Sequence, residues 1–425
     1  MTQANITKAT PLYPWHRANG ATMGEFAGYS MPLWYDSAKN EHLAVLTTSG
    51  LFDTSHMSFV MVAGNNAREL LQFCFSRDLD LCLSGGSRAL KTGRCVYGVF
   101  LNHEGHVFDD AVVCQMADDR YLVVVNAGMG MEISGHLRSQ QKTGQQARVM
   151  DITVDTGKVD LQGPLAAKIV WKILKQPGTD LADFPYFAFK GSFDPDISGS
   201  SGVFLKDGTP VMLSRSGYTG EFGFEIFIAR QSLKDLWLRL LEAGKDLGIK
   251  PCGLAARDSL RAGAGLPLAH QDIGNWIFLN NPWSFALPFN RDKPGFTKNF
   301  IGAHALLSAR DPGYTYPFAG YDARKVSAGE ALVMDGQDNE MGKVLTCVTD
   351  MGIDWDKGRI FRIGVGQGAG TPRPRGLCCG FLWLRSKVET GSEIVLRDKR
   401  RDIKACIVEQ IRPGLTARRS LKEML

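Results

Sequence analysis

The sequence predicts a protein of mixed α and β structure, with two or three domains and an all-β C-terminal third. At 425 residues the chain is too long for a single small hydrophobic core. Its first two thirds contain both helical and strand patterns, most clearly at 231–248 and 94–126. From about Trp283 onward, short apolar stretches alternate with glycines and prolines, which is typical of a β module.

Two short helices are expected near the N-terminus and between the first strands. One covers 39–48, and the other covers 67–75 with Asn65 or Asn66 as its capping residue. Gly50 closes the first helix. The second has Leu70, Leu71 and Phe73 among its apolar positions.

The clearest helix covers 231–248. Its apolar residues recur at i, i+3, i+4, i+7 and i+8, and they are Leu233, Leu236, Trp237, Leu240 and Leu241. A further helix, 253–261, carries the adjacent Arg257 and Asp258. Neighbouring positions on a helix do not face each other, so Arg257 needs another partner, either protein or ligand. A surface ion pair or helix cap is the alternative for these two residues.

Strands are expected in three places. A strand at 58–62 precedes a meander, in which Asn102 to Gly105 and Asp118–Asp119 separate the segments 95–101, 109–115 and 120–126. The apolar run 123–125 indicates a strand buried on both faces. Near the C-terminus, 393–396 and 403–411 predict a hairpin. The segments 190–210 and 364–370 are rich in glycine, and we expect both to be loops. No helix follows 364–370, which excludes a dinucleotide-binding or P-loop site there.

Charge and cysteine content exclude several classes of protein. A net charge of +5 suits an acidic partner or anionic substrate but is smaller than expected for a nucleic-acid-binding protein. Nine scattered cysteines without a C-x-x-C pair predict free thiols, and the histidine spacing predicts no metal site. We expect no membrane segment and a cytoplasmic location, because no long apolar window and no apolar leader occur.

Residues 215–229 combine a glycine turn with a strand. Gly217, Gly220 and Gly223 let the backbone bend close to a flat ligand. Beyond them, apolar residues alternate at Phe222, Phe224, Ile226 and Ile228. Glu221 lies at the hinge, where its carboxylate could accept two hydrogen bonds from a donor–donor edge such as that of a pterin. A plain hairpin with a solvated glutamate is the alternative.

Two further segments could carry chemistry. Asp109 and Asp110 are adjacent on a strand, so only one of them faces a given site. A carboxylate there could stabilise a developing cation, and two solvated carboxylates are the alternative. His56 is either a catalytic base or a hydrogen-bonded structural residue. Met57 either packs against a flat ring of a ligand or belongs to the hydrophobic core.

Taken in order, these motifs resemble the aminomethyltransferase family, the T-protein of the glycine cleavage system. The resemblance spans about residues 10–310. The matching segments are 31–35, 51–57, 96–101, 105–110, 125–127, 161–164, 216–221 and 251–261, followed by 265–268 and 272–273.

The resemblance implies a fold and a reaction. The expected fold is an α+β cloverleaf of three domains around a central folate site. Two interleaved α/β domains cover 1–50 with 150–280 and 51–149, and a C-terminal β-barrel covers 281–425. The family transfers an aminomethyl carbon from the lipoyl arm of a partner H-protein to tetrahydrofolate and releases ammonia.

The resemblance also implies site residues. The family's catalytic carboxylate falls on Asp109, and its folate-binding acid and arginine fall on Glu221 and Arg257. Four other positions near the cofactor fall on Met57, Tyr97, Asn126 and Tyr218.

The chain departs from the family pattern near the donor side of the expected site. The departures are 129–133, 262–265 and 268–273, with extra length near 187–208 and 353–376. They leave two other functions open: a tetrahydrofolate-dependent demethylase or methyltransferase of a small methylated substrate, and a non-catalytic folate-binding relative.

Overall fold

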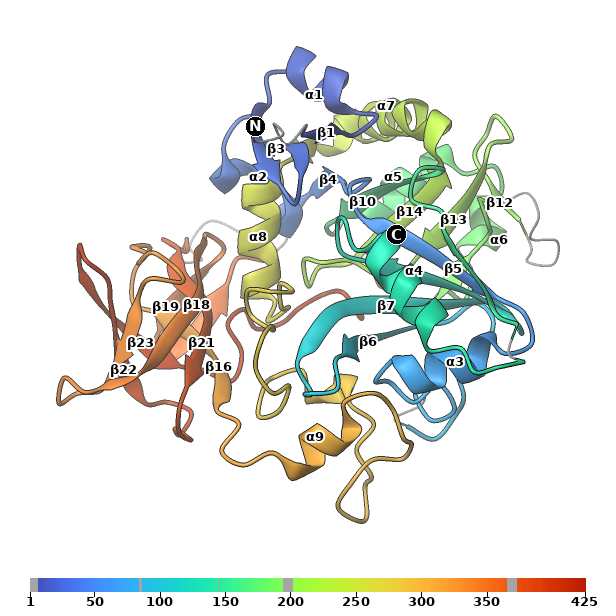
Figure 1. Ribbon diagram of the computed structural model, residues 1–425. Coiled ribbons are helices and arrows are strands. Elements are labelled where there is room, and N and C mark those ends of the chain that lie inside the picture. The colour runs from blue at the N-terminus through green and yellow to red at the C-terminus, as the bar shows by residue number, and fades with distance from the viewer. Residues whose placement is uncertain (1–6, 84–85, 145, 194–201, 365–372) are drawn as a thin grey trace, which may run out of the picture.

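The computed structural model describes residues 7–83, 86–144, 146–193, 202–364 and 373–425. It contains two large sheets and a closed barrel, which surround a central region crossed by helix α8, Leu254–Gly263 (Figure 1). The predicted α+β class with interleaved α/β parts and a C-terminal barrel is confirmed. Most of the predicted loop 364–370 and residues 194–201 lie outside the described residues.

The first large sheet takes strands from two separate parts of the chain. Its order is β11 (Phe189–Lys190), β13 (Pro210–Ser214), β14 (Gly223–Ala229), β10 (Thr156–Gln162), β4 (Ser49–Asp53) and β15 (Ile249–Cys252), with β12 (Val203–Phe204) paired to β13. Strand β4 comes from before the second sheet and the other strands come from after it. This order makes the two sheets interleaved in sequence.

One face of this sheet forms a hydrophobic core with helices α5 (Ala166–Ile173) and α7 (Leu233–Gly244). Successive side chains of a strand point to opposite faces, so every second residue of β10 and β14 enters this core. These residues are Val159, Leu161, Phe224, Ile226 and Ile228. The four alternating residues predicted around β14 are all buried in it. Helix α7 is shorter than predicted, because short 3₁₀ turns flank it at both ends.

The second sheet is antiparallel throughout. Its order is β6 (Cys95–Leu101), β7 (Val107–Ala117), β8 (Arg120–Val125), β5 (Ser58–Ala63) and β9 (Arg148–Asp151). The predicted meander is thus confirmed, and residues 123–125 are buried as expected. Helices α3 (Ala67–Cys74) and α4 (Gly130–Ser139) cover its outer face. Asn66 is the N-cap residue of helix α3, one of the two predicted, although its side chain makes no capping hydrogen bond.

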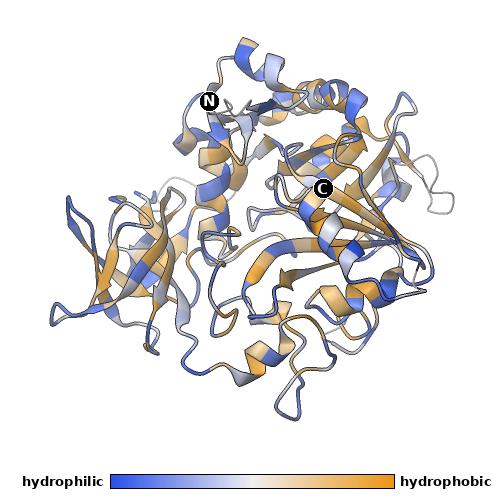
Figure 2. Cartoon of the chain, in the orientation of Figure 1, coloured by the Kyte–Doolittle hydropathy of each residue, from blue (hydrophilic) through white to orange (hydrophobic). Residues whose placement is uncertain are grey.

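The two sheets pack against each other through their remaining faces. Apolar residues of both meet in one cluster that includes Phe59, Met61, Leu122, Met212 and Phe227. Figure 2 shows hydrophobic residues along the strands of both sheets. The same two faces also carry polar side chains further along the strands. A polar and an apolar region therefore share one interface between the sheets.

The barrel is closed by six antiparallel strands. They are β16 (Tyr314–Gly320), β21 (Leu377–Leu384), β18 (Glu340–Asp350), β17 (Leu332–Met334), β22 (Glu393–Arg397) and β23 (Asp402–Ile407). The predicted hairpin is β22–β23. The change to all-β structure begins at Tyr314 and not at Trp283, since 284–286 form a 3₁₀ turn and Ala303–Ser308 form helix α9.

Smaller elements complete the chain. The N-terminal part holds a three-stranded sheet and two helices, and single elements lie between and after the larger units. They are β1 (Lys8–Ala9), α1 (Tyr13–Ala18), β2 (Thr22–Phe26), β3 (Tyr29–Trp34), α2 (Ala38–Thr47), α6 (Pro177–Asp180), β19 (Ile353–Asp356), β20 (Arg359–Arg362) and α10 (Leu421–Met424). The expected helices at 39–48 and 253–261 are α2 and α8. The expected loop at 190–210 contains part of β11 and all of β12.

Arg412 joins the barrel to the central helix. Its guanidinium contacts Asp350 of β18 at 2.5 Å and donates to the carbonyl oxygens of Leu260, at 3.1 Å, and Thr219. Asp350 also contacts His42 of helix α2, with 2.8 Å between Oδ1 and Nε2. Arg412 and Asp350 are buried, and each is the other's counter-ion. The ion pair and its hydrogen bonds therefore join five segments that are distant in sequence.

We predict that Arg412→Met lowers the free energy of unfolding by about 3–5 kcal/mol, because it leaves the buried Asp350 carboxylate without its guanidinium partner. Urea denaturation measures this change. The matched control is Arg324→Met, which breaks the exposed ion pair with Asp322 and should leave stability nearly unchanged. Equal effects of the two variants would contradict the importance given to Arg412.

Candidate active site

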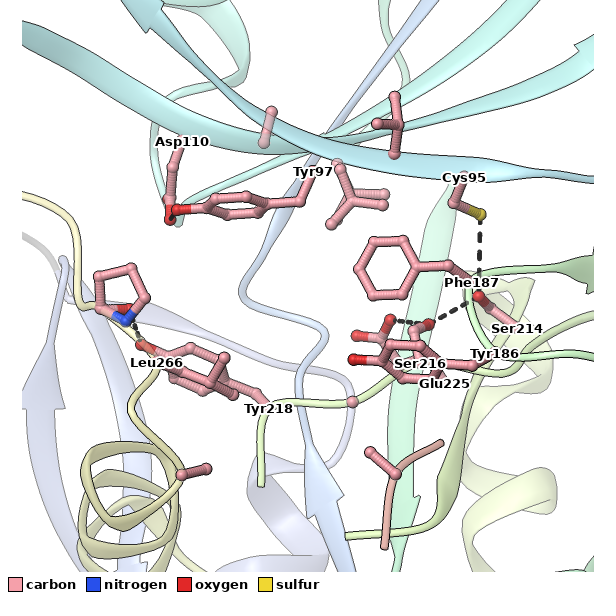
Figure 3. A pocket seen from close by; sticks show the side chains of 18 of the residues that line it. Cys95, Tyr97, Asp110, Tyr186, Phe187, Ser214, Ser216, Tyr218, Glu225 and Leu266 are labelled. Carbon is pink, nitrogen blue, oxygen red and sulfur yellow. Dashed lines mark hydrogen bonds between the residues drawn. The ribbon is translucent and has the colours of Figure 1, made fainter. Parts of the chain in front are cut away.

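A cavity of about 650 Å³ lies at the polar end of the interface between the two sheets. Strands β6 and β7 supply one wall, β10 and β14 supply another, and helix α8 and the segment after β13 supply a third (Figure 3). Five of the seven residues predicted for the site line this cavity, and they are Met57, Tyr97, Asn126, Tyr218 and Arg257. The structure places Asp109 and Glu221 outside its lining.

The two adjacent aspartates of β7 point to opposite faces of the strand. Asp110 lines the cavity, and the fully buried Asp109 faces the same side as Val113, which belongs to the core under helices α3 and α4. Asn126, just after β8, joins them, because its Nδ2 donates to both Oδ1 atoms at 2.6 Å. The carboxylate in the cavity lining is therefore that of Asp110, and Asp109, the residue expected from the resemblance, lies outside that lining.

Burial controls the charge of this pair. Burial and the adjacent Asp110 carboxylate raise the pKa of Asp109 to about 8. Burial also raises the pKa of Asp110, against the hydrogen bonds donated by Tyr97 and Asn126. Two neighbouring buried carboxylates ionise together only at a high free-energy cost, so the pair holds one negative charge near neutral pH. Asp109, whose pKa the Asp110 carboxylate raises, is then the protonated member of the pair, and the charge belongs on Asp110, which accepts a hydrogen bond from Tyr97 at 2.8 Å.

The opposite wall carries a chain of alternating charges. Glu225 of β14 contacts Lys158 Nζ at 2.6 Å, Lys158 contacts Asp160 at 2.5 Å, and Asp160 contacts Arg257 at 2.9 Å. Ser216 donates a further hydrogen bond to Glu225. The Lys158 and Arg257 cations lower the pKa of Asp160 against the effect of burial. Each acid has a cation, so these charges are held in place and Glu225 presents its carboxylate to the cavity.

Glu221 faces away from the cavity, toward the C-terminal segment. Gly220 turns the chain with φ of +73°, a conformation that favours glycine. The Glu221 carboxylate then meets Arg362 at 3.0 Å and accepts from Thr416 at 2.7 Å, with Arg412 at 3.4 Å. Glu221 therefore lies outside the cavity lining, whereas Glu225, four residues further on, lies within it.

Aromatic rings and a buried histidine complete the lining. Tyr186 and Phe187 lie with centroids 4.8 Å apart, and Arg257 lies 4.7 Å from the centroid of the Tyr218 ring. His56 is 2% exposed, and burial lowers its pKa to about 4. Its Nδ1 has no hydrogen-bond partner within the described part of the chain. A neutral imidazole nitrogen therefore remains available to a ligand.

Sequence reasoning missed Glu225, Lys158 and Asp160. The signal was present in the alternation itself: Glu225 lies between the core residues Phe224 and Ile226, so it must face the other side of the sheet. Lys158 and Asp160 alternate in the same way with Val159. Charged residues inside a buried strand indicate a polar face, and here that face is the cavity.

No group of three or more His, Cys, Asp or Glu side chains is placed to hold a metal ion among the residues described. Within the same residues, no helix is long and apolar enough to cross a membrane.

Comparisons with known proteins agree with this fold. The GCVT N-terminal domain matches residues 12–278. An aminomethyltransferase of Lysinibacillus sphaericus is 33% identical over 352 residues, 80% of this chain and 86% of the relative. One of Caldanaerobacter subterraneus subsp. tengcongensis is 34% identical over 316 residues, 74% and 77% of the two chains.

A solved structure matches nearly the whole chain. The glycine cleavage system aminomethyltransferase T from Bartonella henselae has a TM-score of 0.72 and 27% identity, over 95% of this chain and 97% of its own. Fold and site together define an enzyme that transfers one-carbon units. More narrowly, this chain belongs to the aminomethyltransferase family, the T-proteins of glycine cleavage. The relatives do not favour the demethylase or the non-catalytic alternative.

We predict a pH dependence of stability that comes from Asp109. Its folded pKa of about 8 exceeds the unfolded value of about 3.9, so folding takes up a proton between these pH values. The contribution of Asp109 is greatest in acid and is lost as the pH rises toward 8, by at most about 1.4 kcal/mol per pH unit. Urea denaturation of wild type and Asp109→Asn from pH 5 to 8 measures it. Parallel curves for the two proteins would contradict the shared proton.

Proposed function

We propose that this protein accepts an aminomethyl carbon from the lipoyl arm of an H-protein, transfers it to tetrahydrofolate, and releases ammonia. The observation that carries the proposal is a cavity with one ionised carboxylate, Asp110, on one wall and a second carboxylate, Glu225, on the other. Lys158 and Ser216 hold Glu225 in position. The first suits a reaction that develops positive charge. The second suits a flat ligand with a donor–donor edge.

The lining fits tetrahydrofolate. Glu225 can accept the amino and ring N–H groups of a pterin, and Tyr186, Phe187 and Tyr218 offer aromatic faces. Two buried nitrogens in the wall, His56 Nδ1 and Arg94 Nε, have no hydrogen-bond partner among the described residues, so a polar ligand can satisfy them. Arg418 adds a cation for the glutamate end of a folate.

The chemistry assigned to this chain is electrostatic. Tetrahydrofolate, when bound, supplies the amine nitrogens that accept the carbon. Asp110 stabilises the positive charge that develops on that carbon as the amine departs, and the walls exclude water, which strengthens this interaction. Tyr97 and Asn126 hold the Asp110 carboxylate in place through their hydrogen bonds. Glu225 and Arg257 orient the ligand at reacting distance.

An acidic partner protein is consistent with the charge of the chain. The net charge of +5 favours encounter with an acidic surface, and the effect is greatest at low salt. We propose the lipoylated H-protein as that partner, in accordance with the family.

The donor is tested by mass spectrometry of the folate pool. The protein and tetrahydrofolate are incubated either with aminomethylated H-protein or with a panel of methylated small molecules. Methylenetetrahydrofolate and ammonia from the first mixture are the expected result. Methyltetrahydrofolate formed only in the second would replace the proposal with a demethylase.

Asp110→Asn should lower turnover by roughly 100-fold or more, because it removes the charge that stabilises the transition state. The matched comparison is Asp109→Asn, one residue away and outside the cavity, which should retain most of the turnover. Single-turnover kinetics with the aminomethylated donor measure both. A larger loss in Asp109→Asn than in Asp110→Asn would return the catalytic assignment to Asp109.

Glu225→Gln should weaken tetrahydrofolate binding by about 1.5–3 kcal/mol, the range for a hydrogen bond to a charged group. Glu221→Gln should leave the affinity unchanged while it lowers stability, since Glu221 pairs with Arg362 and Arg412. Calorimetry on both variants, with circular dichroism as the check on folding, distinguishes them. The reverse pattern would place the pterin on Glu221.

A further inference from the structure

Two cysteines face each other across the cavity wall. Cys95 at the start of β6 is directly opposite Cys114 of β7 in the antiparallel register, and their Sγ atoms are 3.0 Å apart. Both side chains are free thiols and almost fully buried in the protein, and both line the cavity. No step of the proposed reaction uses them.

The backbone at this position is compatible with a disulfide. The N–H of Gln115 donates to the carbonyl of Arg94, and the N–H of Cys95 donates to Phe187, away from β7. Cys95 and Cys114 are therefore a non-hydrogen-bonded pair, the kind in which opposite Cα atoms approach to about 4.5 Å. That separation lies within the range of about 4.4–6.8 Å found for disulfides.

The thiol pair is connected to the acid that faces the ligand. Cys95 Sγ lies 4.0 Å from Ser214 Oγ, and Ser214 Oγ lies 2.6 Å from Ser216 Oγ, which donates to Glu225 (Figure 3). Along the same strand face, Tyr97 lies two residues after Cys95. The sulfur atoms thus lie close to side chains that contact Glu225 on one wall and Asp110 on the other.

We propose that Cys95 and Cys114 form a reversible disulfide in the cavity wall and that this disulfide weakens folate binding. The second part rests on the proposed function, and the first part does not. A peroxide that enters the cavity oxidises one thiol to a sulfenic acid and leaves as water. The second thiol attacks that sulfur, the S–S bond forms and a second water is released. A dithiol reductant reverses the change by thiol–disulfide exchange.

The surroundings set the rate of this oxidation. The hydrogen bond with Cys95 and burial raise the pKa of the Cys114 thiol. Because the thiolate is the reactive form, the pair stays reduced under mild conditions and reacts faster as the pH rises. The ordinary state in a reducing compartment is the dithiol.

Peptide mass spectrometry tests the disulfide without any folate. Trypsin cleaves after Arg94 and Arg120, and the peptide between them contains Cys95 and Cys114 and no other cysteine. After treatment with hydrogen peroxide and alkylation of remaining thiols, this peptide should lose two hydrogen atoms and take up no alkyl group. Dithiothreitol should restore both alkylation sites. Oxidation that stops at sulfenic or sulfinic acid, or that spares this peptide, would overturn the proposal.

Ligand binding tests the second part. The protein is oxidised, freed of peroxide and titrated with 5-formyltetrahydrofolate, a reduced folate that is stable in air. The oxidised form should bind about tenfold more weakly than the same sample after dithiothreitol, the size of one lost hydrogen bond. In Cys95→Ser and in Cys114→Ser, peroxide treatment should not change the affinity.

The outcomes separate the two proposals. A disulfide that forms without a change in affinity would overturn the coupling to Glu225. A reduced protein that binds no folate would contradict the proposed function and leave the disulfide to be judged from its peptide alone.

Discussion

The buried ion pair between Arg412 and Asp350 is the constraint on which the arrangement of the site depends. It connects a barrel strand to the C-terminal segment, to the carbonyl of Leu260 in helix α8 and to the carbonyl of Thr219. Helix α8 carries Arg257, and Thr219 follows Tyr218, so two cavity residues are positioned by contacts with the barrel region. The barrel is far from the chemistry in sequence, yet it holds one wall of the cavity in place.

The cavity exists because the facing sides of the two sheets are apolar at one end of their interface and charged at the other. At one end of the interface, apolar side chains such as Phe59 and Met212 meet and exclude water. At the other end the same faces carry Asp110, Lys158 and Glu225. Buried charges are tolerated there because each acid is paired with a cation or shares a proton with its neighbour. Such pairing adds little net stability but holds side chains in one geometry, and a site that binds a flat ligand requires that property.

Periodicity in the sequence predicted which residues form the core, because a face of a strand is a local property. Phe224 and Ile226 were recognised for this reason, and the alternation that found them also implied Glu225 on the opposite face. The family resemblance added the cavity residues Tyr97 and Asn126, which no local pattern distinguishes from surface residues.

The remaining assignments depended on contacts between distant segments. Glu221 is paired with Arg362, which is 141 residues away in sequence, and no local pattern predicts that partner. The choice between Asp109 and Asp110 depended on which face of β7 meets the other sheet. The thiol pair required the register of β6 against β7, since Cys95 and Cys114 are unremarkable as single residues.

A structure of the protein with bound tetrahydrofolate tests the central claim most directly. The account predicts the pterin edge against the Glu225 carboxylate and the one-carbon nitrogens beside Asp110, with His56 Nδ1 or Arg94 Nε engaged by the ligand. A pterin seated on Glu221, or a folate bound outside the cavity between the two sheets, would contradict it.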